Sequence, residues 1–254
     1  MKCVILISTP RSNSVCITRI LEQTECFNIF HEPYIPVYDK IHYTELTKEW
    51  WKNNSFNESK DVIEAIKTSD KIVLIKDMAF AIVDYYNHLP KESHFILLCR
   101  HPLDVIISFY NKVKQMNYQD ELEIDNWRSL SGFYQLLAIK KKLIKESCNV
   151  LVIPSDNILQ CVKSIFKFLN MEFKDEYTHW KPCTSETDVE YKSTQWKENK
   201  KNHLFVHWHK EALQSDGLHE SIHHSLDEIE NIKHREIIQQ LTNELLLIYY
   251  ELIN

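Results

Sequence analysis

The chain has 254 residues, of which 44% are hydrophobic and 26% are charged, which is typical of a globular protein with a large core. Its formal net charge of −6 argues against a general nucleic-acid binder, because such domains are normally basic. The sequence holds no apolar run long enough to span a bilayer, and its apolar start is too short for a signal-peptide core. We therefore expect a cytoplasmic protein without nucleic acid as a partner and without stable membrane insertion, while an oligomer stays open. Seven scattered cysteines, with no metal-knuckle spacing, predict reduced thiols.

Five short apolar runs predict buried strands, separated by stretches with helical patterns. This alternation indicates an α/β fold: a three-layer sandwich around a mostly parallel five-stranded sheet. We expect a single domain over residues 1–254, with a core over 1–170 and an aromatic and polar segment with a C-terminal helix over 171–254. The predicted strands cover residues 3–7, 26–30, 71–75, 94–99 and 149–153; the predicted helices cover 15–21, 44–68, 79–86, 102–113, 126–147, 157–169 and 226–252; residues 172–217 are predicted to be irregular.

The stretch Thr9–Ser14, here called the first motif, joins the first predicted strand to the first predicted helix. A strand, a tight turn and a helix direct free backbone N–H groups and the positive end of the helix dipole at an anion. Arg11 adds a donor fork suited to phosphate or sulfate oxygens, and Ser12 and Ser14 add hydroxyl donors. The alternative is an ordinary turn in which one of these serines only caps the helix.

Glycine is almost absent from the chain. The two glycines, Gly132 and Gly217, lie far from the first motif, which excludes both the Walker pattern and the three-glycine dinucleotide fingerprint. An anion-binding turn must then be built without glycine. Asn13 stands where a left-handed residue is needed, and asparagine tolerates that conformation better than most residues.

A second motif, Arg100–Ser108, follows the fourth predicted strand. Pro102 suits the first turn of a helix, which places Ser108 about two turns further along it. Arginine gives a phosphate a bidentate contact and serine adds a donor. The alternative is a structural salt bridge at Arg100 and a small residue at a helix contact. Because ligands of parallel sheets bind beyond the carboxyl ends of the strands, we expect the ends of the predicted strands to share one site; the polar residues there are Arg11, Glu32, Lys76 and Arg100.

Together the two motifs resemble the sulfotransferase family that uses 3′-phosphoadenosine 5′-phosphosulfate (PAPS). The first resembles its 5′-phosphosulfate loop, commonly Thr-Pro-Arg-Ser-Gly-Ser, and the second resembles its 3′-phosphate motif, an arginine followed by a proline and, eight residues after the arginine, a serine. His31-Glu32-Pro33-Tyr34 and the fifth strand with its helix follow in the family's order, so that the likeness covers about residues 2–170. It implies a P-loop NTPase-like fold and transfer of a sulfuryl group from PAPS to a hydroxyl of a carbohydrate, lipid or small metabolite, without a metal.

The resemblance also assigns roles. It implies that residues of both motifs, and the residue that follows the first motif, bind PAPS. It implies that Arg11 stabilises the charge on the leaving phosphate. It also implies a carboxylate base after the second strand, as in bacterial members. Glu32 is the first candidate for the base and His31 the second, although the preferred reading of His31 is a core hydrogen-bonding residue. The implied donor-binding residues are Arg11, Ser12, Asn13, Ser14, Val15, Arg100 and Ser108.

Four features stay open. Asn13 in place of the usual glycine is compatible with a catalytically degenerate protein that keeps the fold as a nucleotide-binding or effector protein. Lys76-Asp77 is either an ion pair near the acceptor or a strand-end cap. A basic stretch that includes Trp196, Lys197, Lys200 and Lys201 could approach the nucleotide, as a late basic stretch does in the family, or is a solvated charge run. A histidine tract invites a zinc reading, because His203 and His207 could share a helical face, but no metalloprotease pattern accompanies them and a polar surface is the default. The tract comprises His203, His207, His209, His219, His223 and His224.

Overall fold

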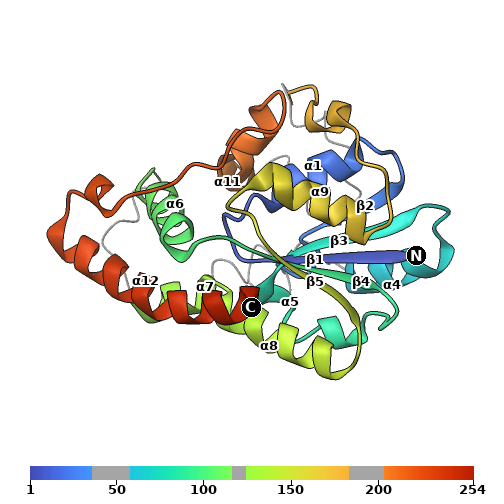
Figure 1. The fold of residues 1–254 in the computed structure, drawn as a ribbon, viewed down its shortest axis with the longest axis horizontal. Coiled ribbons are helices and arrows are strands. Elements are labelled where there is room, and N and C mark those ends of the chain that lie inside the picture. The colour runs from blue at the N-terminus through green and yellow to red at the C-terminus, as the bar shows by residue number, and fades with distance from the viewer. Residues whose placement is uncertain (36–57, 116–123, 183–202) are drawn as a thin grey trace.

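A computed structural model describes residues 1–35, 58–115, 124–182 and 203–254 (Figure 1). Five parallel strands form one sheet in the order β2-β3-β1-β4-β5, which confirms the predicted sheet. The central strand β1 is buried along its whole length, as expected for a strand between two helical layers. The strands are β1 (Cys3–Ser8), β2 (Phe27–His31), β3 (Ile72–Met78), β4 (His94–Cys99) and β5 (Asn149–Pro154).

Two hydrophobic layers enclose this sheet, so the predicted three-layer arrangement is confirmed. Val4 and Leu6 of β1 pack in the layer with α1 and α9, whereas Ile5 and Ile7 pack in the opposite layer with α4, α5, α8 and α12 (Figure 1). The period of two along the strand explains this alternation. The helices are α1 (Ser14–Glu22), α4 (Glu58–Thr68), α5 (Ala79–Ile82), α6 (Pro102–Gln115), α7 (Ile124–Leu130), α8 (Phe133–Lys145), α9 (Ile158–Phe168), α11 (His203–Gln214) and α12 (Ile232–Ile253).

Three predicted boundaries in the core are wrong. The third strand runs on to Met78, so Lys76 and Asp77 lie inside β3. The helix predicted over 79–86 stops at Ile82, and a 3₁₀ turn follows over Tyr86–His88. The helix predicted over 126–147 is two helices, because Gly132 adopts a left-handed φ of 73° between α7 and α8.

The C-terminal part also differs from the prediction. Within 172–217, predicted to be irregular, α11 is a regular helix. The last helix begins at Ile232, where the side chain of Asn231 accepts a hydrogen bond from the backbone of His234, and not at residue 226. Ile232, at the start of this helix, is 71% exposed. The buried residues of the helix are Ile238, Leu241, Thr242, Leu245, Tyr249 and Leu252.

Several predictions fall outside the described residues. These are the first part of the helix predicted over 44–68 and the basic stretch that includes Trp196 and Lys197.

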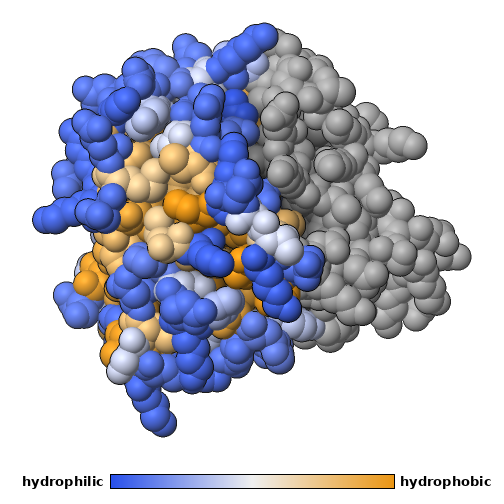
Figure 2. Space-filling model, turned by 90° about the vertical axis from the view of Figure 1, so that its right-hand side faces the viewer, coloured by the Kyte–Doolittle hydropathy of each residue, from blue (hydrophilic) through white to orange (hydrophobic). Residues whose placement is uncertain are grey.

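Among the helices that the structure describes, none combines the length and the hydropathy needed to cross a bilayer. A second view shows an apolar area bordered by hydrophilic side chains on one face (Figure 2).

Candidate functional site

The carboxyl ends of the strands bring the predicted polar residues to one edge of the sheet. The backbone N–H of Thr9 donates to the carbonyl of Leu98 at 3.0 Å, which holds the first motif against β4. On the other side, the N–H of Glu32 donates to the carbonyl of Lys76 at 2.6 Å. The parallel sheet therefore gathers segments that are distant in sequence, as predicted.

The first motif turns without glycine. Arg11 and Asn13 both adopt left-handed backbone conformations, with φ of 56° and 61°. The hydroxyl of Ser12 donates to the carbonyl of Thr9 at 2.6 Å, which closes the turn from within. Asn13 precedes α1 but makes no side-chain capping bond, so it leaves the first N–H groups of that helix uncapped. Its Nδ2 instead donates to Oγ of Ser221 at 3.1 Å.

The two motifs are in direct contact. Nε of Arg11 donates to Oγ of Ser108 at 2.9 Å, and Nη1 of Arg100 donates to the carbonyl of Arg11 at 3.2 Å. Burial lowers the pKa of Arg11, while the carboxylate of Glu211, 3.9 Å from its Nη2, opposes the shift. Two arginines therefore lie close together in a partly desolvated place, each with a carboxylate beside it.

Arg100 is nearly fully buried, and the chain itself occupies two of its three nitrogens. Nη2 donates to the carbonyl of Ile222 and lies 3.5 Å from the carboxylate of Asp104. Asp104 in turn accepts hydrogen bonds from the backbone of His224 at 2.7 Å and, at 3.0 Å, shares one with Nδ1 of His223. Residues 221–224, here called the covering segment, thus lie over both motifs. Sequence reasoning missed this segment and Asp104.

Some buried polar atoms at this edge make no hydrogen bond within the part of the chain that the structure describes. They are Nε of Arg100, Oγ1 of Thr9 and Oγ of Ser155, at the ends of β4, β1 and β5. A buried donor without a partner is costly, and its usual explanation is a bound group or water. Nε of Arg100 is a cationic donor, and a phosphate oxygen is a suitable acceptor for it.

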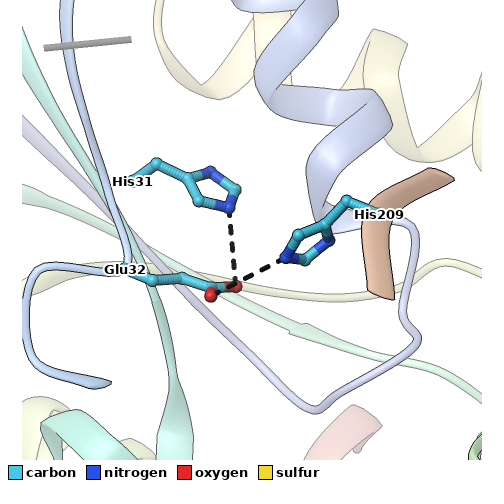
Figure 3. A group of neighbouring side chains, drawn as sticks. All are labelled: His31, Glu32 and His209. Atoms are coloured by element: carbon cyan, nitrogen blue, oxygen red, sulfur yellow. Dashed lines mark ion pairs between the residues drawn. The ribbon is translucent and has the colours of Figure 1, made fainter. Parts of the chain in front are cut away.

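A second cluster lies beside the first motif and consists of His31, Glu32, Lys76 and His209, here called the Glu32 cluster. The ammonium of Lys76 pairs with Oε1 of Glu32. Nε2 of His31 lies 3.6 Å from Oε1, and Nε2 of His209 lies 3.9 Å from Oε2. Figure 3 shows both imidazole rings directed at the carboxylate.

Burial and neighbouring groups together set the ionisation of this cluster. Burial raises the pKa of Glu32, but Lys76, with its charge and its hydrogen bond, and the two histidines together outweigh burial, and the pKa falls to about 2. Burial lowers the pKa of His209 to about 4 and the pKa of His31 well below its usual value. Near neutral pH Glu32 is therefore a carboxylate and both imidazoles are neutral.

The side chain of Asp77 caps backbone N–H groups. Its carboxylate accepts hydrogen bonds from the N–H groups of Tyr34 and Met78, both at 2.7 Å. Of the two alternatives for Lys76-Asp77, the structure gives the cap to Asp77 and pairs Lys76 with Glu32.

The histidine tract divides among several sites. The side chains of His203 and His207 lie outside the described residues. His219 is exposed and pairs with Asp216, and His224 pairs with Glu228. His209 joins the Glu32 cluster, which sequence reasoning missed because no spacing links residues 31 and 209. His31, Glu32 and His209 offer ligand atoms within 4.8 Å of one another, a geometry in which a metal ion could be held, whereas the sequence predicted no metal site.

The chain was compared with known proteins. No family model matches it, and no curated protein does. Among solved structures it is similar to the sulfotransferase domain of the curacin biosynthetic pathway, with 17% identity, a TM-score of 0.44 and coverage of 69% of this chain and 76% of that one. It is also similar to a sulfotransferase from Alicyclobacillus acidocaldarius, with 14% identity, a TM-score of 0.49 and coverage of 69% of this chain and 87% of that one. A third similar structure is retinol dehydratase in complex with retinol and 3′-phosphoadenosine 5′-phosphate (PAP), with 13% identity, a TM-score of 0.45 and coverage of 96% of this chain and 81% of that one.

Sulfotransferases, whose motifs the sequence resembles, are therefore among the solved structures similar to this chain. At these identities and TM-scores the similarity concerns the fold. The function has to be inferred from the residues of the site.

Proposed function

We propose that this chain is a sulfotransferase that moves a sulfuryl group from PAPS to a hydroxyl group of a carbohydrate, lipid or small metabolite. One observation carries the proposal: the first and second motifs meet through the bonds from Arg11 to Ser108 and from Arg100 to the carbonyl of Arg11. PAPS carries phosphate groups at both ends of one ribose. Two adjoining anion-binding motifs suit such a donor better than they suit a nucleotide with a single phosphorylated end.

The first motif binds the 5′-phosphosulfate end in this proposal. The N–H groups of Ser12, Asn13, Ser14 and Val15 lie at the start of α1, where the helix dipole favours negative charge. Arg11 adds a guanidinium.

The second motif binds the 3′-phosphate. Nε of Arg100 is a buried donor that makes no hydrogen bond to the described residues, and Ser108 adds a hydroxyl. Arg100 also bonds Ile222 through Nη2, so a phosphate that is bound by both Nε and Nη2 displaces the Ile222 carbonyl and shifts the covering segment.

The reaction needs no redox step. The acceptor oxygen forms a bond to sulfur, the bond between sulfur and the 5′-phosphate oxygen breaks, and PAP leaves with the electron pair. Preorganised donors that face the developing charge are each worth a few kcal/mol, and here Arg11 and the N–H groups of the first motif supply them. The acceptor loses a proton, and the Glu32 cluster beside this motif is the place that receives it. Glu32 supplies the negative charge there, and His31, which is fully buried, packs against it.

Calorimetry with PAP and with AMP tests the assignment of the donor. We expect PAP to bind more tightly, because only PAP places a phosphate at Arg100 and Ser108. A parallel assay follows the conversion of PAPS to PAP in the presence of simple phenols. Equally weak binding of PAP and AMP would contradict the role of the second motif.

A second candidate is a nucleotide-binding or effector protein that keeps the fold without catalysis. Two observations favour it: the Asn13 side chain is bonded to Ser221 and the Arg100 guanidinium to Ile222, both in the covering segment. An Asn13→Gly variant discriminates between the candidates. Turnover of PAPS by this variant and not by the wild type would support the non-catalytic reading of the natural chain.

A further inference from the structure

A histidine from outside the region of sequence resemblance reaches the Glu32 cluster. His209 lies on α11, and its ring meets that of His31 edge-on, with 5.4 Å between the centroids and 88° between the planes. Two residues later, Glu211 lies 3.9 Å from Arg11 of the first motif. One helix therefore touches both the place where the donor is proposed to bind and the place where the acceptor loses its proton.

Glu32 itself is poorly suited to be the base. Its Oε1 is paired with the fully buried ammonium of Lys76, and its pKa of about 2 makes it a weak proton acceptor. His31 has no exposed surface, so an acceptor cannot reach it. The side chain of His209 is 10% exposed, which makes it the imidazole of this cluster that a substrate can reach.

We propose that His209 is the catalytic residue that takes the proton from the acceptor hydroxyl and that Glu32 is its positioning residue. This inference rests on the proposed function. In the tautomer that this proposal uses, the hydrogen is on Nε2, which lies 3.9 Å from Oε2 of Glu32, and the lone pair is on Nδ1. As the acceptor oxygen bonds to sulfur, its proton moves to Nδ1, and the carboxylate stabilises the imidazolium that forms. The proton then passes to water after PAP has left.

The charged groups around His209 agree with this role. Burial lowers its pKa to about 4, Glu32 and Glu211 raise it, and Lys76 and Arg11 lower it. His209 is therefore neutral at neutral pH, and the nearby Glu32 carboxylate favours the charged form that the uptake of a proton creates. A carboxylate that orients the imidazole is the arrangement by which such bases are commonly held.

A metal ion is the rival occupant of this cluster. Two neutral imidazoles and a carboxylate are ligands that zinc prefers. The Lys76 ammonium, however, already neutralises Glu32, and a divalent cation would have to lie beside that buried positive charge. The base is therefore the better-supported assignment.

The test uses the whole protein and two phenols at a pH at which 4-nitrophenol is ionised and phenol is not. A His209→Gln variant should lower kcat with phenol by about 10²–10⁴-fold, because phenol needs a base. It should lower kcat with 4-nitrophenol less than about tenfold, because this acceptor has already lost its proton. Added imidazole should restore part of the turnover of His209→Ala with phenol. His219→Gln, at an exposed histidine outside the cluster, is the matched control and should resemble the wild type.

Each outcome decides something. Calorimetry with PAP should give the same affinity for His209→Gln as for the wild type, which separates catalysis from folding and donor binding. Equal losses with both phenols, or wild-type turnover in the variant, would overturn the role of His209 and leave the sulfotransferase proposal standing. Turnover that is lost on chelation and restored by zinc would also overturn it, in favour of a metal. A wild-type protein that neither binds PAP nor converts PAPS would overturn both proposals.

Discussion

Nε of Arg11 donates a hydrogen bond to Oγ of Ser108 at 2.9 Å, across 97 residues of sequence. The bond joins the loop that follows the central strand to the helix that follows its neighbour β4. Because Arg100 also bonds the carbonyl of Arg11, a change at either motif is felt at the other. Substitutions in the two motifs should therefore act together on one ligand.

Arg100→Ala should weaken the binding of PAP by about 10–100-fold, since a hydrogen bond to a charged group contributes about 1.5–3 kcal/mol. The affinity for AMP, which lacks the 3′-phosphate, should change much less. Calorimetry with both nucleotides measures the difference. Arg128→Ala, which removes an arginine paired with Glu244 outside both motifs, is the control and should leave both affinities unchanged. An equal loss for PAP and AMP would show that Arg100 only supports the fold.

The covering segment should respond to PAP. Two bonds that hold the segment are the one from the His224 N–H to Asp104 and the one from Nη2 of Arg100 to the carbonyl of Ile222. A phosphate that binds Nη2 of Arg100 removes the second of these bonds. We expect faster amide hydrogen exchange at His224 with PAP than with AMP. Exchange that slows instead would mean that the segment closes over the ligand.

Glu32→Gln should destabilise the protein by about 3–5 kcal/mol at neutral pH, because it leaves the buried Lys76 ammonium without its carboxylate. The folded pKa of Glu32, about 2, lies below its usual 4.5, so this stabilisation is complete above about 4.5 and is lost as the pH falls toward 2. Urea unfolding at several pH values should show wild type and variant converging in acid.

The control for this experiment is Glu64→Gln, at an exposed position of α4. It should change the free energy of unfolding by less than about 0.5 kcal/mol. A difference between wild type and Glu32→Gln that is independent of pH would refute the coupling of Glu32 to Lys76.

Asn13 offers a matched pair of variants. Asn13→Gly and Asn13→Ala both lose the bond to Ser221, but only alanine carries the steric cost of the left-handed conformation. The alanine variant should be less stable than the glycine variant by about 1–2 kcal/mol in urea unfolding. Equal stabilities would mean that the loop relaxes out of this conformation.

Two leucines of α12 test how the last helix is held. Leu245 is fully buried in the layer below the sheet, whereas Leu247 is 73% exposed. Leu245→Ala should lower the free energy of unfolding by about 2–5 kcal/mol, and Leu247→Ala should change it by less than about 0.5 kcal/mol. Similar losses would argue that the outer face of α12 is also covered.

The strands and the two motifs were predictable because their signals are local. An apolar run such as 94–99 ends at Arg100, and a parallel sheet carries every such end to one edge. The contact between Arg11 and Ser108 follows from that rule together with the helical spacing of the second motif. The break at Gly132 was missed, although the glycine itself was the available signal.

What stayed hidden depends on contacts between distant segments. Nothing near residue 209 in the sequence indicates Glu32, and nothing near residue 222 indicates Arg100. Both contacts arise from packing of the C-terminal third onto the core, where no repeat or motif marks the partner. The partner of Lys76 was missed for a related reason. The sequence offered only its neighbour Asp77, whereas the Asp77 carboxylate accepts hydrogen bonds from the backbone of Tyr34 and Met78, and Lys76 pairs with the distant Glu32.

The strand order also has a consequence for biosynthesis. β1 leaves the ribosome before its partners β3 and β4, which lie about 70 and 90 residues further along the chain. Until they are made, an almost wholly apolar strand has both edges open, which is the condition under which nascent chains associate wrongly. Safe production of this protein should therefore depend on shielding β1 until β4 has emerged.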